Sequence, residues 1–335
     1  MTTLLIDCHA HLYPPYYPVR RDKDGDEDDE GAQAVADALS DARNPICVVI
    51  VTECLDDWHA VCRLLARRPE LAVRTALCVG VHPMQRTDAP ELGSGSTMRS
   101  VRMHDLTATL AWWQTQQTAA DARIVGVGEI GLDFSPHILA THPEGVEAAR
   151  TEQRAVFAAQ LAVARRLQLP VNVHSRQAGR HALEVLREAG YGAAAADVAA
   201  QDDNGDEVHG VLLHAFDGRP RYIREGLALG AYFSVAPSLA RDPLLERLVA
   251  QVPLDRLVLE SDAPALGMAR GEPSAPHQIS WVCQRIAELK GVTTAQVAAA
   301  TTANALRLFP RLRPHLAVAA HISIAHHTAT HGPLV

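Results

Sequence analysis

The chain has 335 residues, a length that suits one or two average domains or a single α/β barrel. Hydrophobic residues make up 47% of the chain and charged residues 21%, which excludes a disordered, collagenous or coiled-coil protein. The formal net charge of −8 excludes nucleic-acid binding by a basic surface spread over the whole molecule. Any contact with a polyanion must therefore be local.

Short apolar runs alternate with longer amphipathic segments from end to end, a pattern typical of repeated strand–helix units and a parallel sheet. Eight such units predict an α/β protein with a closed (β/α)8 barrel, or TIM barrel. A doubly wound open sheet would not explain why polar residues follow nearly every strand. The expected strands are residues 4–6, 46–51, 75–79, 124–127, 171–173, 211–213, 231–234 and 257–259. Residues 144–168 and 295–309 show helical periodicity, and the second segment is expected to cap the barrel.

We expect one barrel domain over residues 1–313, decorated by three inserted segments. Segment 22–30 holds seven acidic residues and one lysine, which predicts a solvated loop. Segment 88–103 follows the third strand and is expected to be a floppy insert, or a lid over the rim. Segment 191–210 is rich in alanine and aspartate and faces the opposite end. The histidine-containing tail, residues 314–335, is expected to be disordered.

The six cysteines are scattered without a C-x-x-C pair and are expected to be buried thiols. Residues 1–5 carry no cationic leader, and no run reaches about 18 uncharged apolar residues. We therefore expect an intracellular protein, cytoplasmic or nuclear, that is not secreted and does not contact a membrane. The sequence leaves protein partners undetermined.

Histidines and carboxylates recur where the expected strands end. His9 and His11 lie two apart at the end of the first strand, so both imidazoles can face the same side. An isolated His-x-His pair is only a weak indication of a metal. Four more candidate ligands follow later strands: Glu129, His174, His214 and Asp262. The carboxyl ends of barrel strands converge on one rim, so the six residues together predict a metal site there.

Four imidazoles and two carboxylates exceed the needs of one tetrahedral ion. They predict two divalent ions joined by a bridging carboxylate, for which we expect Glu129. Imidazole ligands favour zinc, iron, cobalt or manganese over magnesium; we expect zinc, with manganese or magnesium as alternatives. Two such ions activate water for hydrolysis, and Asp262 is expected to bind one ion and accept a proton from that water.

At these residues the sequence resembles the TatD family of metal-dependent deoxyribonucleases, from Asp7 to about Arg313. Within that family it is most similar to the branch called TatD-domain-containing protein three. The motifs are Asp-Cys-His-Ala-His-Leu at 7–12, Gly-Val-His-Pro at 80–83, Gly-Glu-Ile-Gly-Leu-Asp-Phe at 128–134, Leu-Pro-Val-Asn-Val-His-Ser-Arg at 169–176, His-Ala-Phe-Asp-Gly at 214–218 and Glu-Ser-Asp-Ala-Pro at 260–264.

The resemblance implies a TIM barrel with a two-ion site and the same six ligands. It also implies cleavage of phosphodiester bonds in DNA, often from the 3′ end, so single-stranded DNA or 3′ ends are the expected partners. His82 and Arg176 would lie near the substrate phosphate. Asp217 departs from the family, since most relatives have a serine there, and it adds negative charge near the rim.

Other hypotheses remain open from the residues alone. An amidohydrolase acting on a small amide or ester would share the rim architecture, although many such enzymes use a carboxylated lysine bridge and no lysine lies near Glu129. A non-catalytic metal-binding protein is the third possibility. Asp133 is expected to orient a ligand from outside the metal shell. Four further arginines could ring the mouth of the site with Arg176: Arg180, Arg219, Arg221 and Arg224.

Overall fold

The computed structural model describes residues 4–14, 16–17, 20–21, 27–28, 36, 39, 46–87, 98–115, 123–192 and 210–313. In these residues eight parallel strands form a closed barrel in the order β1-β12-β11-β10-β9-β8-β5-β4. The barrel strands are β1 (Leu5–Ala10), β4 (Ile46–Val51), β5 (Thr75–Cys78), β8 (Ile124–Asp133), β9 (Val171–Arg176), β10 (Val211–Leu213), β11 (Tyr232–Val235) and β12 (Leu257–Leu259). The predicted TIM barrel is confirmed.

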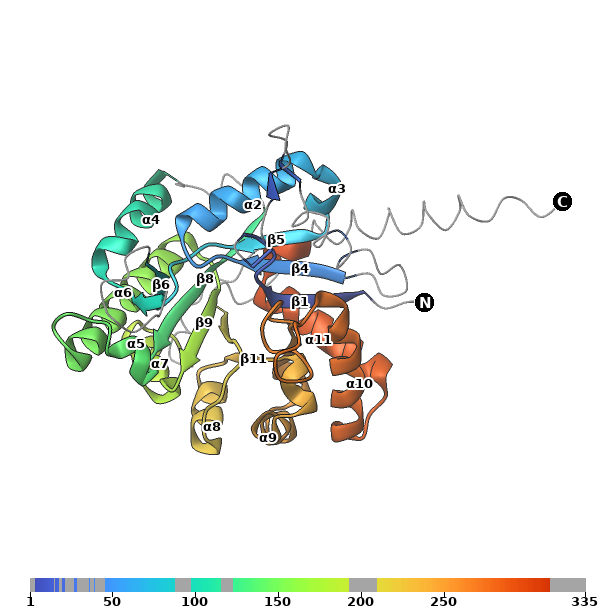
Figure 1. Ribbon diagram of the computed structural model, residues 1–335. Coiled ribbons are helices and arrows are strands. Elements are labelled where there is room, and N and C mark those ends of the chain that lie inside the picture. The colour runs from blue at the N-terminus through green and yellow to red at the C-terminus, as the bar shows by residue number, and fades with distance from the viewer. Residues whose placement is uncertain are drawn as a thin grey trace.

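Helices connect the strands and lie around the outside of the barrel (Figure 1). They are α2 (Leu55–Arg67), α3 (Pro69–Ala72), α4 (Met103–Thr115), α5 (Pro136–Leu139), α6 (Val146–Leu167), α7 (Gly179–Glu188), α8 (Pro220–Ala228), α9 (Pro243–Gln251), α10 (Ile279–Lys290) and α11 (Thr294–Leu308). Short 3-10 turns are η1 (Pro237–Ala240), η2 (Leu254–Arg256), η3 (Pro276–Gln278) and η4 (Pro310–Leu312). The helices predicted at 144–168 and 295–309 correspond to α6 and α11.

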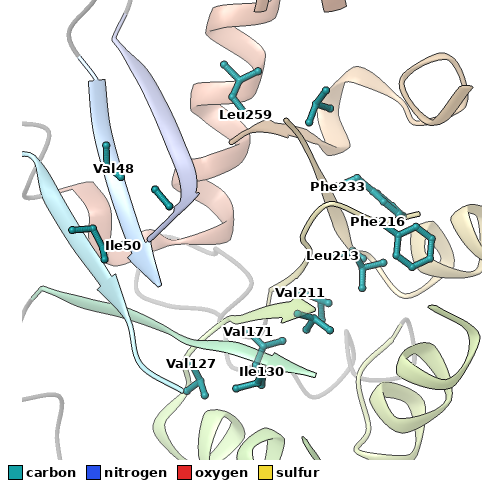
Figure 2. Packing of buried hydrophobic residues seen from close by; sticks show 14 of the residues in the cluster. Val48, Ile50, Val127, Ile130, Val171, Val211, Leu213, Phe216, Phe233 and Leu259 are labelled. Carbon is teal, nitrogen blue, oxygen red and sulfur yellow. The ribbon is translucent and has the colours of Figure 1, made fainter. Parts of the chain in front are cut away.

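The barrel strands are apolar on both faces, because one face packs on helices and the other fills the barrel. In β4, Val48 and Ile50 belong to a cluster that includes Val61 and Leu64 of α2. Figure 2 shows this cluster, which continues around the strands. The intervening Val49 belongs to a second cluster, built from β1, β4, β5, β8, β10, β11 and β12 inside the barrel. Burial on both faces explains the short continuous apolar runs in the sequence.

Helix α11 closes the end of the barrel where the strands begin. Phe309, just after the helix, packs in the interior cluster. Thr302 donates a hydrogen bond to the carbonyl of Leu4 (2.8 Å), and the Asn304 amide donates to the carbonyl of Leu257 at the start of β12 (2.6 Å). The predicted cap is therefore confirmed, and the Asn304 hydrogen bond holds α11 against β12. The candidate ligands lie toward the opposite end, where the strands finish.

Three barrel strands extend further than predicted. Strand β1 continues to Ala10, β8 to Asp133 and β9 to Arg176. His9 lies at the end of β1 as predicted. Glu129 and His174 lie within β8 and β9, so the expectation that each ends its strand is wrong for these two. The reason is that β8 and β9 stay paired beyond their apolar runs, as far as Asp133 and Arg176. The polar residues in this stretch interrupt the apolar run by which a strand is predicted.

The inserted segments are partly ordered. Residues Glu27–Asp28 form β3, which pairs with β2 (Arg20–Arg21), so the expected plain loop is wrong there because backbone pairing joins the two pieces. In segment 88–103, β7 (Met98–Ser100) pairs with β6 (Met84–Arg86). The Ser100 amide also donates to Thr141 (2.9 Å), so this part is anchored and not floppy. Residues 88–97, 193–209 and 314–335, and with them most of the predicted inserts and the tail, lie outside the described residues.

Four of the six cysteines are buried as expected, whereas Cys54 and Cys62 are only partly buried. Among the described residues, none of the six forms a disulfide. Within the described residues, no helix is both long enough and apolar enough to span a membrane.

Candidate metal centre

Glu129 owes its position to a bulge in β8. The register between β8 and β9 shifts between Val127 and Ile130, and such bulges redirect the side chain at the extra residue. Beyond the bulge Gly131 pairs with His174. Gly131 has a φ of +140°, and a Cβ there would overlap the carbonyl oxygen of His174, so this close approach requires glycine. The approach of the two strands brings Glu129 beside His174.

His9, His11 and Asp262 form a group at the adjoining ends of β1 and β12. The Asp262 amide donates to the His9 carbonyl (2.9 Å), and the His11 amide donates to the Ala263 carbonyl (2.8 Å). Asp262 adopts a left-handed conformation with φ of +50°, which is uncommon for a residue other than glycine. Its Oδ1 lies 3.6 Å from His9 Nε2 and 3.5 Å from His11 Nε2. The two Nε2 atoms are themselves 3.2 Å apart.

The Glu129 carboxylate lies between two pairs of imidazoles. Its Oε2 is 3.3 Å from Nε2 of both His9 and His11. Its Oε1 is 2.7 Å from His174 Nδ1 and 3.7 Å from His214 Nε2. One oxygen therefore faces each pair, which is the arrangement expected of a bridging carboxylate. The structure brings all six predicted ligands together; their binding of ions stays a prediction.

His82 is closer to the ligands than the resemblance implied. It is buried, and its Nε2 lies 3.5 Å from Glu129 Oε1. Its Nδ1 lies 3.1 Å from the Met84 amide nitrogen and 3.2 Å from the Met84 carbonyl oxygen, so Met84 holds the ring with Nε2 toward the Glu129 carboxylate. His82 thus contacts the bridge itself and is available as a further ligand or as a hydrogen-bond donor at the reacting centre.

The charges of the site shift its pKa values in opposite directions. Burial favours the neutral form of Glu129, but the positive charges of His82 and His9 outweigh it and hold the pKa of Glu129 well below its usual value. Burial works against protonation of His174, yet its hydrogen bonds with Asp133 and Glu129 raise its pKa to about 10. Burial also works against protonation of His214, but the negative charges of Glu260 and Asp262 raise its pKa to about 9. In the metal-free protein His174 and His214 therefore hold protons where cations would otherwise sit, whereas burial lowers the pKa of His9. Ion binding must release the protons of His174 and His214.

The donor set fits divalent ions. Three trios have ligand atoms within 4.8 Å of one another: His9, His11 and Glu129; His9, His214 and Glu260; His82, Glu129 and His174. A mixture of imidazole nitrogen and carboxylate oxygen suits zinc or manganese. Two of the three trios share Glu129, and the donor residues in these two trios outnumber the four ligands of a single tetrahedral ion.

Residues outside the predicted set hold the imidazoles in place. Nδ1 of His9 lies 2.9 Å from Asn172 Oδ1, and Nδ1 of His11 lies 3.0 Å from the Tyr13 hydroxyl. Nδ1 of His214 lies 2.7 Å from Glu260 Oε2. The sequence analysis missed these partners, although each stands two residues from a predicted ligand. Alternation along a strand could have placed them near the same site.

Asp133 occupies the position expected of an outer partner. Its Oδ2 lies 3.3 Å from His174 Nε2, and its Oδ1 accepts a hydrogen bond from the Ser135 amide (2.8 Å). Burial raises and the hydrogen bond with His174 lowers the pKa of Asp133, which settles at about 2. Asp133 is therefore an ionised partner that faces the imidazole from outside the site.

A cavity of about 260 Å³ opens beside the candidate ligands. It is lined by His174, Ser175, Arg176, His214, Ala215, Phe216, Asp217, Ala236, Ser238, Asp242, Leu244, Leu245, Asp262 and Leu266. Arg176 is the one arginine in this lining. Of the other arginines, Arg180 and Arg221 form exposed ion pairs along their own helices, with Glu184 (2.7 Å) and Glu225 (2.9 Å). The predicted ring of five arginines is thus reduced to Arg176 at the cavity.

Comparison with known proteins agrees with this geometry. A family model described as TatD related DNase matches residues 6–310. The chain is 36% identical to the human deoxyribonuclease TATDN3 over 309 residues, which is 92% of this chain and 96% of the relative. It is 32% identical to the 3′-5′ ssDNA/RNA exonuclease TatD of Cronobacter sakazakii over 200 residues, 57% of this chain and 67% of the relative.

Solved structures share the fold at lower identity. The crystal structure of the TatD homologue YJJV from Escherichia coli K12 has a TM-score of 0.66 at 22% identity and covers 91% of this chain and 98% of its own. Such a likeness supports the barrel only. The match to the family model over nearly all of the described barrel, with TATDN3 similar along its whole length, shows that the chain belongs to the TatD family of DNases.

Proposed function

We propose that this protein is a metal-dependent hydrolase that cleaves phosphodiester bonds in DNA. The observation that carries the proposal is the Glu129 carboxylate, with one oxygen toward His9 and His11 and the other toward His174. The names of the relatives support the substrate, since they are deoxyribonucleases or a single-strand exonuclease. The finer proposal is a 3′–5′ exonuclease acting on single-stranded DNA or 3′ ends. An intracellular location, cytoplasmic or nuclear, stays a prediction from the sequence.

The proposed ligands are His9, His11, Glu129, His174, His214 and Asp262, and zinc is the first choice of metal, with manganese or magnesium as alternatives. Two divalent ions there would polarise the scissile bond and lower the pKa of a water between them. Asp262 would accept the proton of that water. Burial opposes its ionisation, but the hydrogen bond with His11 and the charge of His214 lower the pKa of Asp262, so it is ionised at neutral pH.

The cavity offers a place for the substrate next to the ligands. Arg176 closes β9 two residues after His174, and its guanidinium can form two parallel hydrogen bonds with one phosphate. Phe216, Leu244 and Leu245 provide apolar surface for a sugar or base. The lining also contains three aspartates, Asp217, Asp242 and Asp262, so positive charge is confined to Arg176. Such a lining suits one nucleotide better than a long stretch of polyanion, in keeping with the acidic balance of the chain.

A lysine-bridged amidohydrolase is less consistent with the site. The chain has two lysines, Lys23 and Lys290. Lys290 donates to the carbonyl of Val252 at the end of α10, away from the candidate ligands. Glu129 holds the bridging place instead.

Removing bound metal is expected to abolish cleavage. We expect the wild-type protein, after treatment with chelator and dialysis, to leave labelled single-stranded oligonucleotides intact, because without ions nothing polarises the scissile bond and lowers the pKa of the attacking water. Addition of zinc or manganese should restore cleavage, with products shortened from the 3′ end on sequencing gels. Cleavage that continues when metal analysis finds no ion would exclude the proposal, and internal products would exclude the exonuclease mode alone.

Replacing Arg176 by glutamine is expected to lower kcat/KM on single-stranded DNA by about 10- to 100-fold, because a hydrogen bond to a charged phosphate contributes about 1.5–3 kcal/mol. The matched control is Arg180→Gln, which removes an exposed arginine paired with Glu184 on α7. Steady-state kinetics with oligonucleotides checks both variants. Equal kinetics for the two would mean that Arg176 does not contact substrate.

A further inference from the structure

The outer partners of the four imidazoles divide into two kinds. His9 and His11 have neutral partners, the Asn172 amide oxygen (2.9 Å) and the Tyr13 hydroxyl (3.0 Å). The partners of the other two imidazoles are carboxylates: Glu260 for His214 (2.7 Å) and Asp133 for His174 (3.3 Å). The two rings with neutral partners face Glu129 Oε2, and the two rings with carboxylate partners face Oε1.

The direct ligands show the opposite division. Asp262 Oδ1 lies within 3.6 Å of Nε2 of both His9 and His11 and adds a carboxylate to that side. On the other side, Glu129 is the carboxylate in contact with both His174 and His214. On the His9–His11 side the additional carboxylate, Asp262, therefore lies beside the ligand nitrogens. On the His174–His214 side the additional carboxylates lie one imidazole ring further out.

Glu260 is buried against the His214 ring. Its side chain is fully buried, and its Oε1 has no hydrogen-bond partner among the described residues. A buried carboxylate is costly unless a positive charge compensates it. The contact that Glu260 does make is with the His214 ring, whose opposite nitrogen faces Glu129. Positive charge held at that opposite nitrogen would compensate Glu260 through the ring.

We propose that Glu260, with Asp133, is a positioning residue that strengthens cation binding on the His174–His214 side. The two carboxylates would supply negative charge to that side through the imidazole rings, whereas Asp262 supplies it directly on the His9–His11 side. The inference rests on the proposed two-ion site. Glu260 accepts a hydrogen bond from His214 Nδ1–H, which fixes the ring orientation and leaves the Nε2 lone pair toward the site. Asp133 orients His174 in the same way.

The two sides consequently respond differently to loss of an outer charge. Substituting Glu260→Gln keeps the shape and a hydrogen-bond acceptor but removes the charge. We expect the affinity of one of two ions to fall by about 10- to 100-fold, as for other outer partners of metal-binding histidines. The other ion should bind as in the wild type. A side chain with only a packing role would weaken both ions or neither.

Cobalt(II) titration of the metal-stripped protein, followed by its visible absorption, tests this without any activity measurement. The wild type should bind two equivalents; the Glu260→Gln variant should bind one equally well and the second more weakly. In a His11→Asn background, which damages the opposite side, Glu260→Gln should still weaken the remaining ion by the same factor. The matched control is Glu272→Gln, at an exposed position in the loop after β12.

Two results would overturn the inference. Unchanged affinity for both cobalt ions in Glu260→Gln would do so while leaving the two-ion site intact, whereas a wild type that binds fewer than two ions would remove the two-ion site as well. If Glu260→Gln does not fold by circular dichroism, Asp133→Asn takes its place, since it removes the other outer charge on the same side. Its failure to weaken one ion selectively would equally overturn the inference.

Discussion

Glu129→Ala is expected to lower the rate of DNA cleavage by about 1000-fold or more, since loss of several kcal/mol of charge stabilisation costs tenfold per 1.4 kcal/mol. Glu129 contacts imidazoles on both sides, so its removal affects both proposed ion positions at once. We expect the variant to bind fewer than two ions. Single-turnover cleavage of a labelled oligonucleotide and metal analysis of the dialysed protein measure the two effects.

The control for this substitution is Glu144→Ala, which removes an exposed carboxylate from the loop before α6. It should cleave as the wild type does. Thermal unfolding with chelator present separates a folding defect from loss of the site, because both proteins are then compared without ions. Wild-type cleavage by Glu129→Ala would reject the mechanism, whatever metal the protein holds.

The fold and the six candidate ligands could be predicted because they depend on patterns that are local in sequence. Apolar runs of three to six residues mark strands such as β4 and β10 wherever both faces are buried. Parallel barrel strands end on one rim, so polar residues after the runs are brought together by topology alone. His9 and Asp262, at opposite ends of the chain, meet because β1 and β12 are neighbours.

What the sequence did not predict depends on how one strand sits against another. The bulge in β8 and the continuation of β9 to Arg176 follow from pairing between the strands, which apolar periodicity does not encode. Asn172 and Glu260 looked like ordinary strand residues, and their role is visible only when a particular imidazole lies opposite. The arginines of α7 and α8 were equally ambiguous, because a helix surface and the mouth of a site have the same local composition.

Gly131→Ala is expected to destabilise the protein by about 3 kcal/mol or more, because it combines an unfavourable backbone conformation with a steric clash. The new methyl group would overlap the His174 carbonyl at a φ of +140°, forcing β8 and β9 apart. Since Glu129 and His174 come from these strands and lie 2.7 Å apart, cleavage should fall together with stability. Urea unfolding and oligonucleotide cleavage check the two effects.

Gly271→Ala separates the clash from the backbone conformation. Gly271 has a φ of +82°, and a methyl group on its Cα would meet no atom within 4 Å, so its substitution should cost about 1 kcal/mol and leave cleavage unchanged. The difference between the two variants is then the contribution of the close approach between β8 and β9. Equal, small losses in both would show that the strands can separate without harm, and that the position of Glu129 does not depend on glycine at 131.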